Sequence, residues 1–294
     1  MASPDTTLDR PIGKLGVIGA GLMGSGIAEV SARAGIDTIV IEASEEAAKA
    51  GRSRLEKSLD RAVKAGKMDV ADQVKTLDSL VFTSKIGSLE DRDMVIEAII
   101  ENENAKTSVF RQLDDIVAST DAVLASNTSS IPIMKLAMAT KRPEHVIGIH
   151  FFNPVPVLHL VELVTSLHTS DQTQKIAQDF SAGQLGKRVI HSKDRAGFIV
   201  NALLIPYILS AVRMFESGFA SKEDIDQGMV TGCAHPMGPL ALADLIGLDT
   251  TMAVAESLYE EFKEQLYAPP PLLARMCEAG LLGRKTGRGF YDYH

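Results

Sequence analysis

Hydrophobic and polar positions follow two different periods along the first two thirds of the chain. Short apolar, β-branched runs predict strands, and stretches with apolar residues every three or four positions predict helices between them. Strands that alternate with helices predict a mainly parallel, doubly wound sheet. The expected strands are Lys14–Ile18, Ile36–Ile41, Leu80–Thr83, Met94–Ile99, Ala122–Ser126, Val146–His150, Leu158–Val164 and Arg188–His191. The expected helices are Leu22–Ala34, Ser44–Ala65, Val70–Leu77, Lys106–Val117 and Pro132–Met138, with one more between the last two strands.

From about Gly197 onward the pattern is almost entirely helical. The polar stretch Ser192–Ala196 is the natural boundary, so we expect one domain over residues 1–194 and another over residues 195–294. The predicted fold class is α/β, a Rossmann-like doubly wound sheet with a second, smaller all-α domain. The expected helices of the second domain are Phe198–Ser217, Lys222–Val230, Thr250–Leu266 and Pro271–Ala279.

The segment Ala196–Val212 carries no charge and is largely apolar. It is short for a membrane span and contains Asn201 and Pro206, so it predicts a buried helix, kinked or broken near the proline. The first residues, Met1–Gly13, are polar and lack the apolar run of a signal peptide. We therefore expect no membrane association and a cytoplasmic location.

Composition excludes several classes of function. A net charge of −8 over 294 residues disfavours nucleic acid as a partner, because a phosphate-binding surface is expected to be basic. The two cysteines, Cys233 and Cys277, are too few for a disulfide framework and are expected to be reduced thiols. The histidines and cysteines lack metal-ligand spacing, so no metal is expected. The absence of a GxSxG motif disfavours a serine hydrolase.

A glycine-rich segment, Gly19-Ala20-Gly21-Leu22-Met23-Gly24, follows the first strand and opens a helix. The glycines allow a tight turn and a close approach of the backbone to a pyrophosphate, which would lie on the helix N-terminus. Glu42 ends the second strand about twenty residues further on, where an acid binds ribose hydroxyls and repels a 2′-phosphate. No arginine follows in Ala43–Glu46. The pattern predicts NAD rather than NADP, and a plain glycine turn is the alternative.

One predicted helix is basic in this acidic protein. Seven Lys and Arg residues lie between Lys49 and Lys67, against two acids. Arg54, Lys57, Arg61 and Lys64 recur every three or four residues and can share one face, with Ser58 among them. Such a face would steer a substrate that carries several phosphates. The alternative is a solvated helix surface without a ligand.

Candidate acid–base chemistry lies near the ends of later strands. His150 ends one apolar strand and Glu162 lies inside the next. A carboxylate among aliphatic side chains is costly unless paired, so we expect Glu162 to orient the His150 ring and to stabilise its imidazolium. Ser129 follows shortly after the strand that ends at Ser126. Position alone leaves a structural role open for both His150 and Ser129.

Together these residues make the chain resemble the L-3-hydroxyacyl-CoA dehydrogenase family, especially its short-chain 3-hydroxybutyryl-CoA type. The resemblance extends from Lys14 to Tyr293 and is specific because it rests on several motifs at once. The motifs are Gly19–Gly24, Glu97–Asn102, Ser126–Ser130, His150–Pro156, Gly197–Asn201, His235–Pro239 and Gly283–Phe290.

The resemblance implies reversible oxidation of a (3S)-3-hydroxyacyl-CoA with NAD. It implies that His150 is the base, that Glu162 is its partner, and that Ser129 and Asn201 hold the substrate oxygen. Further implied contacts to NAD come from Glu101, Lys106, Asn153 and Lys285.

The resemblance also implies contacts to coenzyme A. Ser58 matches one such contact, and the second, basic one falls near Ala65, where Lys64 or Lys67 would replace it. Glu42 stands where an Asp is more usual in the family. The resemblance also implies a homodimer formed through the helical domain, with Ala196–Val212 as part of the interface.

Two other functions stay open. One is a related dehydrogenase of a free hydroxy acid or sugar acid, such as gulonate, against which the basic helix and Ser58 argue. The other is a crystallin-like structural protein that retains only cofactor binding. The joint presence of Ser129, His150, Glu162 and Asn201 argues against the second.

Overall fold

The computed structural model describes residues 10–293 and divides into two compact units, Met1–Asp194 and Arg195–His294. The expectation that Met1–Gly13 is not a signal peptide falls mostly outside the described residues. Within residues 10–293, no helix combines the length and the apolar character needed to cross a membrane.

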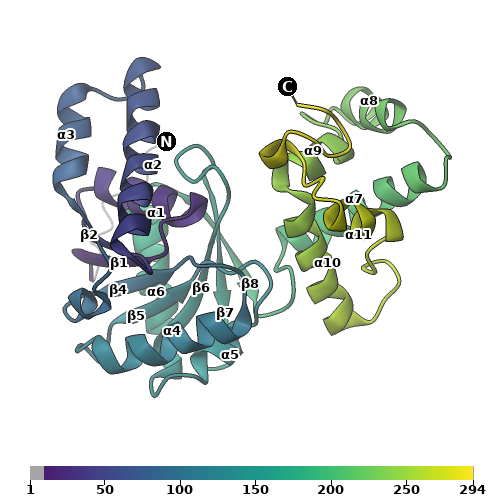
Figure 1. The fold of residues 1–294 in the computed structure, drawn as a ribbon. Coiled ribbons are helices and arrows are strands. Elements are labelled where there is room, and N and C mark those ends of the chain that lie inside the picture. Colours follow the sequence, from purple (N-terminus) through teal and green to yellow (C-terminus); the bar gives the residue numbers. More distant parts are fainter. Residues whose placement is uncertain (1–9, 294) are drawn as a thin grey trace, which may run out of the picture. The chain divides into compact units, whose positions relative to one another are not determined.

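The first unit is built on one eight-stranded sheet with the order β3-β2-β1-β4-β5-β6-β7-β8 (Figure 1). The strands from β3 to β6 are parallel, β7 runs antiparallel to β6, and β8 runs parallel to β7. The predicted Rossmann-like α/β class is confirmed, and the reversal at β7 is a feature that the sequence pattern did not reveal. The strands are β1 (Lys14–Ile18), β2 (Asp37–Ile41), β3 (Leu80–Thr83), β4 (Met94–Glu97), β5 (Val123–Ser126), β6 (Val146–Phe151), β7 (Leu160–Thr165) and β8 (Arg188–Lys193).

The helices of the first unit follow the expected order. The clearest difference is α4, which begins three residues before the predicted Lys106, because the Asn102 side chain accepts a hydrogen bond from the Ala105 N–H at 3.0 Å and caps the helix. The helices are α1 (Leu22–Arg33), α2 (Glu45–Lys64), α3 (Val70–Asp78), α4 (Glu103–Ile116), α5 (Ile133–Ala137) and α6 (Asp171–Gln178), with short turns η1 (Ile86–Leu89) and η2 (Pro143–His145) and a π-helical turn η3 (Asp179–Gln184).

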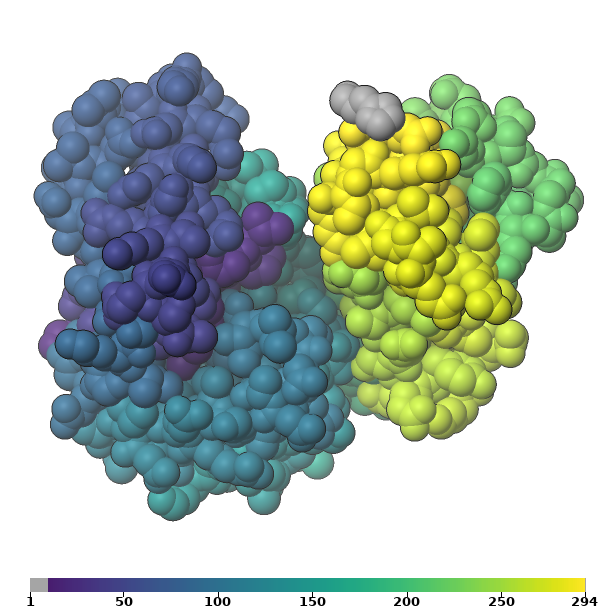
Figure 2. All heavy atoms as spheres, viewed as in Figure 1, coloured from purple at the N-terminus to yellow at the C-terminus, as the bar shows by residue number. Residues whose placement is uncertain are grey.

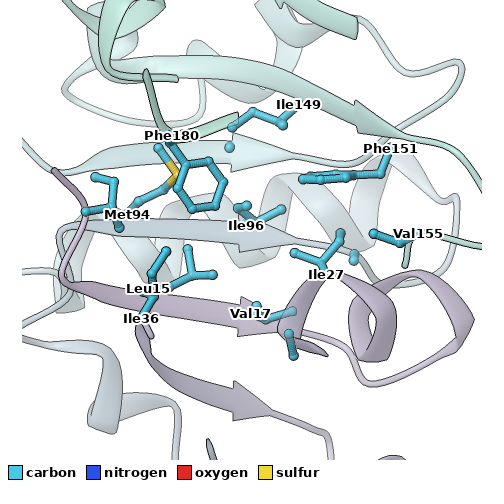
Figure 3. Close-up of a cluster of buried hydrophobic side chains, with 14 of the residues drawn as sticks. Leu15, Val17, Ile27, Ile36, Met94, Ile96, Ile149, Phe151, Val155 and Phe180 are labelled. Atoms are coloured by element: carbon cyan, nitrogen blue, oxygen red, sulfur yellow. The ribbon is translucent and has the colours of Figure 1, made fainter. Parts of the chain in front are cut away.

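A buried apolar cluster lies between one face of the sheet and helices α1, α2 and α6 (Figure 3). Ile149 and Phe151 of β6 belong to it, as does Ile27 of α1. Side chains alternate between the two faces of a strand, so His150, between Ile149 and Phe151, points to the opposite face. The same alternation sends Glu162 to that face, because its neighbours in β7 belong to the cluster. The core thus sets the direction of both polar side chains.

The second unit consists of helices around its own apolar core. Its α7 runs without a break through Pro206, so of the two expected outcomes, a kinked or a broken helix, the broken one is wrong. Packing offsets the missing hydrogen bond, since Ile205 and Ile208 beside the proline are buried. A short helix, α9, was not expected. The elements are α7 (Val200–Glu216), α8 (Lys222–Gly232), α9 (Pro239–Ile246), α10 (Leu248–Phe262), α11 (Pro271–Glu278) and the turn η4 (Arg284–Thr286).

The buried Asp244 of α9 holds the C-terminal segment of the second unit. Its carboxylate accepts hydrogen bonds from the Phe290 N–H at 2.9 Å, the Tyr291 N–H at 2.9 Å and the Tyr293 hydroxyl at 3.0 Å. Burial, together with this hydrogen bond and the negative charge, raises the pKa of Tyr293 to about 12. The segment that carries Lys285 is therefore fixed within its own unit.

Candidate active site

The glycine loop between β1 and α1 is shaped by two close backbone contacts. Gly19 has φ +94°, and a Cβ there would lie 2.6 Å from the Ala98 carbonyl oxygen. A Cβ on Gly24 would lie 1.8 Å from the Gly19 carbonyl oxygen. Glycine is therefore required at both positions by the protein itself.

Gly21 differs from these two glycines. A Cβ at this position would meet nothing within 4 Å. Gly21 is the N-cap of α1, and no side chain caps this helix or adds a negative charge in its first turn. The first N–H groups of α1 have no partner within the helix and no capping side chain, and a helix N-terminus of this kind suits a phosphate. The loop fits the pyrophosphate of a dinucleotide.

Glu42, immediately after β2, is held against the same loop. Its Oε1 accepts a hydrogen bond from the Ala20 N–H at 2.6 Å, and its Oε2 accepts one from the Ala43 N–H at 3.1 Å. On the other side, the guanidinium of Arg54 from α2 donates to the Ala20 carbonyl. A carboxylate beside the loop at the end of the second strand fits a ribose-binding role.

The pairing of β6 with β7 brings the expected His–Glu pair together. His150 lies directly opposite Glu162 in the antiparallel register. Nδ1 of His150 lies 2.8 Å from Oε2 of Glu162, and both side chains are buried. Opposed residues of an antiparallel pair have neighbouring side chains on one face, so the register of β6 with β7 creates this contact.

Ser129 completes a chain of three side chains. Its Oγ lies 3.0 Å from Nε2 of His150, the ring nitrogen that does not face Glu162. An ionised carboxylate only accepts hydrogen bonds, so Nδ1 carries the proton of a neutral ring and Nε2 presents a lone pair. The arrangement has the polarity of a general base oriented by a carboxylate.

The loop that carries Ser129 is held from two directions. Oε1 of Glu101 accepts hydrogen bonds from the Thr128 hydroxyl at 2.6 Å, the Ser129 N–H at 2.8 Å and the Ser130 N–H at 2.9 Å. Oδ1 of Asn127 accepts one from the Phe151 N–H at 2.8 Å, next to His150. Ser129 is therefore placed by backbone contacts rather than by its own side chain alone.

Glu101 is charged in this setting because of Lys106. Burial alone would raise its pKa, but the Lys106 ammonium, 3.4 Å away, and the hydrogen bonds from residues 128–130 outweigh burial and lower it. Lys106 itself is buried, and its ammonium also lies 2.6 Å from Glu97. Its expected contact with NAD stays a prediction, as does that of Glu101.

Two residues near the site were given no role from the sequence, although one of them, Glu97, begins a motif of the family resemblance. Glu97 ends an apolar strand, the pattern that drew attention to His150, and could have been found in the same way. Lys187 gave no such signal. Its buried ammonium donates to the carbonyls of Val155 at 2.6 Å and Leu158 at 2.8 Å, and burial lowers its pKa. It therefore holds the segment that follows His150.

The basic residues of α2 are exposed, which fits both a steering surface and a solvated helix surface without a ligand. Arg54, Lys57, Arg61 and Lys64 all lie on the solvent side of the helix, and Figure 2 shows α2 and α3 at the surface of the first unit. Ser58 lies between them, half-buried, beside Glu29 of α1, whose pKa is raised by burial. Contacts of Ser58 and Lys64 with coenzyme A stay predictions.

The remaining expected residues lie apart from this cluster in the chain. Asn153 is exposed and follows β6, before the cis peptide bond to Pro154. Asn201 lies in the first turn of α7, and Lys285, in η4, pairs with Asp249 at 2.5 Å. The last two belong to the second unit, and their roles toward substrate and NAD stay predictions.

Cys233 and Cys277 are both free thiols, which confirms the expectation for them. Within residues 10–293, no group of three or more His, Cys, Asp or Glu side chains is placed to hold a metal ion.

Comparisons with known proteins assign both units to one family. Residues 14–195 match the family model described as 3-hydroxyacyl-CoA dehydrogenase, NAD binding domain, and residues 197–293 match the C-terminal domain of the same family. A 3-hydroxybutyryl-CoA dehydrogenase of Mycobacterium tuberculosis is 57% identical over 96% of this chain and 99% of that protein. The human mitochondrial hydroxyacyl-coenzyme A dehydrogenase is 41% identical over 94% of this chain and 90% of that protein.

A solved structure gives the same result in three dimensions. The (S)-3-hydroxybutyryl-CoA dehydrogenase of Ralstonia eutropha superposes with a TM-score of 0.91 at 46% identity, over 96% of this chain and 99% of that one. The family models and the solved structure thus agree in sequence and in fold. This chain belongs to the 3-hydroxyacyl-CoA dehydrogenase family, and its first unit is the NAD-binding domain of that family.

Proposed function

We propose that the protein catalyses the reversible NAD-dependent oxidation of a short-chain (3S)-3-hydroxyacyl-CoA, namely 3-hydroxybutyryl-CoA, to the 3-ketoacyl-CoA. The observation that carries the proposal is the Ser129–His150–Glu162 chain, in a domain whose glycine loop fits a dinucleotide pyrophosphate. The names of the relatives at 41–57% identity supply the substrate class.

The residues act as follows in the proposed reaction. Nε2 of His150 accepts the proton of the 3-hydroxyl group, while Ser129 and Asn201 bind the substrate oxygen. Glu162 keeps the ring in the required tautomer and stabilises the imidazolium that forms. NAD, when bound on the glycine loop, supplies the hydride acceptor. In the reverse direction His150 donates the proton to the ketone oxygen.

The remaining parts of the proposal concern binding and assembly. Glu42, Glu101, Lys106, Asn153 and Lys285 contact NAD, and the basic face of α2 with Ser58 and Lys64 binds coenzyme A. The helical unit closes over the substrate and forms a homodimer. We also propose a cytoplasmic location, which two free thiols support.

The test is a series of 3-ketoacyl-CoA substrates of increasing acyl length, assayed with NADH and NADPH in parallel. We expect the highest kcat/KM with acetoacetyl-CoA and NADH, and little turnover of free acetoacetate. His150→Ala should lower kcat about 10²–10⁴-fold, the usual contribution of a positioned acid or base. Turnover of free acetoacetate at the same efficiency would favour a hydroxy-acid dehydrogenase. A wild-type protein that binds NADH but reduces no thioester would favour the structural alternative.

A further inference from the structure

One buried carboxylate near the site has no part in the proposed chemistry. Glu97, the last residue of β4, is fully buried. Its Oε1 accepts hydrogen bonds from the Ile99 N–H at 2.7 Å and from the Lys106 ammonium at 2.6 Å. Its Oε2 accepts one from the Ser126 hydroxyl at 2.6 Å. A buried charge is stable only with such partners, so these contacts fix one position for the Glu97 side chain.

Glu97 anchors the start of the loop that carries Ser129. Ser126 ends β5 directly opposite Glu97 in the parallel register, and the next residue, Asn127, donates its N–H to the Glu97 carbonyl at 2.8 Å. From Asn127 the chain runs through Thr128 to Ser129. Both the backbone and the side chain of Glu97 therefore anchor the point from which the loop leaves the sheet.

Glu97 also acts on the far end of the loop through a shared cation. The Lys106 ammonium lies 2.6 Å from Glu97 and 3.4 Å from Glu101, so two carboxylates compete for it. Glu101 in turn accepts the hydrogen bonds that hold residues 128–130. Lys106 thus links Glu97 to the residue that holds this end of the loop.

We propose that Glu97 is a positioning residue for this reaction, which acts through Ser126 and through Lys106 with Glu101 to hold Ser129 Oγ against Nε2 of His150. The inference rests on the proposed function, because it takes Ser129 as the group that binds the substrate oxygen. Without the negative charge of Glu97, the Lys106 ammonium is drawn to Glu101 alone and the loop shifts. A displacement of about 1 Å at a catalytic group costs about 10²-fold in rate.

Glu97→Gln tests this with little change of shape. We expect kcat for the reduction of acetoacetyl-CoA to fall about 10–100-fold, while KM for acetoacetyl-CoA stays within about threefold. A crystal structure of the variant should show Ser129 Oγ beyond hydrogen-bonding distance of His150 Nε2. An unchanged kcat, or an unchanged Ser129–His150 contact, would overturn the inference.

Asp114→Asn is the matched control. Asp114 is also a nearly buried carboxylate in the first unit, and it pairs with Arg142 at 2.9 Å, outside the network around Glu97. The Asp114→Asn variant should lose thermal stability but keep the wild-type kcat. If the role of Glu97 is merely structural, Glu97→Gln should likewise lose stability and keep its kcat. If the wild type reduces no 3-ketoacyl-CoA, the proposed function fails. The Ser129–His150 distance in the variant structure then still decides the inference.

Discussion

At the scale of single residues, the site depends on polar side chains that strand ends bring into the interior. Glu162 pairs with His150, and Glu97 pairs with Lys106, all four with almost no exposed surface. Removing one partner of such a pair costs about 3–5 kcal/mol, because the other is left buried and uncompensated. Charge-neutral isosteric substitutions therefore separate catalytic from structural effects better than alanine does.

Glu101 predicts a pH dependence of stability. Its pKa lies below the ordinary value of 4.5 in the folded protein, so its contribution to the free energy of unfolding is present above about pH 4.5 and is lost as the pH falls further, through the folded pKa. Glu101→Gln should melt at a lower temperature than the wild type at pH 7, and the difference should shrink below pH 4.5. Thermal melts of both proteins from about pH 3 to about pH 7, which covers the range in which carboxyl groups titrate, measure this difference in melting temperature.

Glu103→Gln is the control for this experiment, because Glu103 pairs with Lys135 on the surface, where ion pairs contribute little. A difference for Glu101→Gln that persists unchanged at low pH would contradict the assignment of the effect to its charge.

At the scale of elements, the loop between β1 and α1 contains two kinds of glycine. Two are required by close packing of the backbone, and the third leaves space in which a ligand can bind. Gly19 and Gly24 face backbone atoms at distances that leave no room for a Cβ. Gly21 faces open space at the end of α1. The same residue type thus serves packing at two positions and binding at the third.

Two alanine substitutions test this division. Gly21→Ala should leave the melting temperature nearly unchanged and weaken NADH binding at least about tenfold, since its Cβ would occupy the space for the pyrophosphate. Gly24→Ala should lower the melting temperature by several degrees, because overpacking costs about 1–3 kcal/mol. Calorimetric melts and NADH fluorescence titrations measure the two effects. Equal NADH affinity in Gly21→Ala and the wild type would show that the pyrophosphate binds elsewhere.

The basic face of α2 gives a second prediction at this scale. Lys57→Glu combined with Lys64→Glu should raise KM for acetoacetyl-CoA about tenfold at low salt with little change in kcat, because steering by exposed charges acts on association. The effect should shrink as ionic strength rises. Lys141→Glu, a change at an equally exposed lysine outside α2, is the control. A salt-independent increase in KM would speak against electrostatic steering.

At the scale of the whole molecule, the chain consists of two units with separate cores, and the exposed surface of the helical unit bears on assembly. Along α7, Leu203 is 73% exposed and Met214 is 40% exposed, with the exposed Ser210 between them. These positions are seven and four residues apart and therefore share one face of the helix. An apolar face of this kind fits an interface between copies of the chain.

Leu203→Glu combined with Met214→Glu should therefore shift the proposed homodimer to monomer in sedimentation velocity, because two like charges would be buried on each side. Val70→Glu, at an exposed apolar position of α3 in the first unit, should leave the dimer intact. A double variant that still sediments as a dimer would place the interface on another face.

The sequence by itself determined most of the elements, though not α9, and it indicated the division near residue 194 and the choice of cofactor, because apolar periodicity, Gly19–Gly24 and Glu42 are local signals. It did not reveal the reversal of β7, since apolar positions alternate alike in a strand that runs either way. Only tertiary structure set His150 against Glu162 and Glu97 against Lys106, because those contacts depend on strand register and helix placement. The residue types therefore indicate acid–base chemistry, while the tertiary structure decides which of these residues are paired.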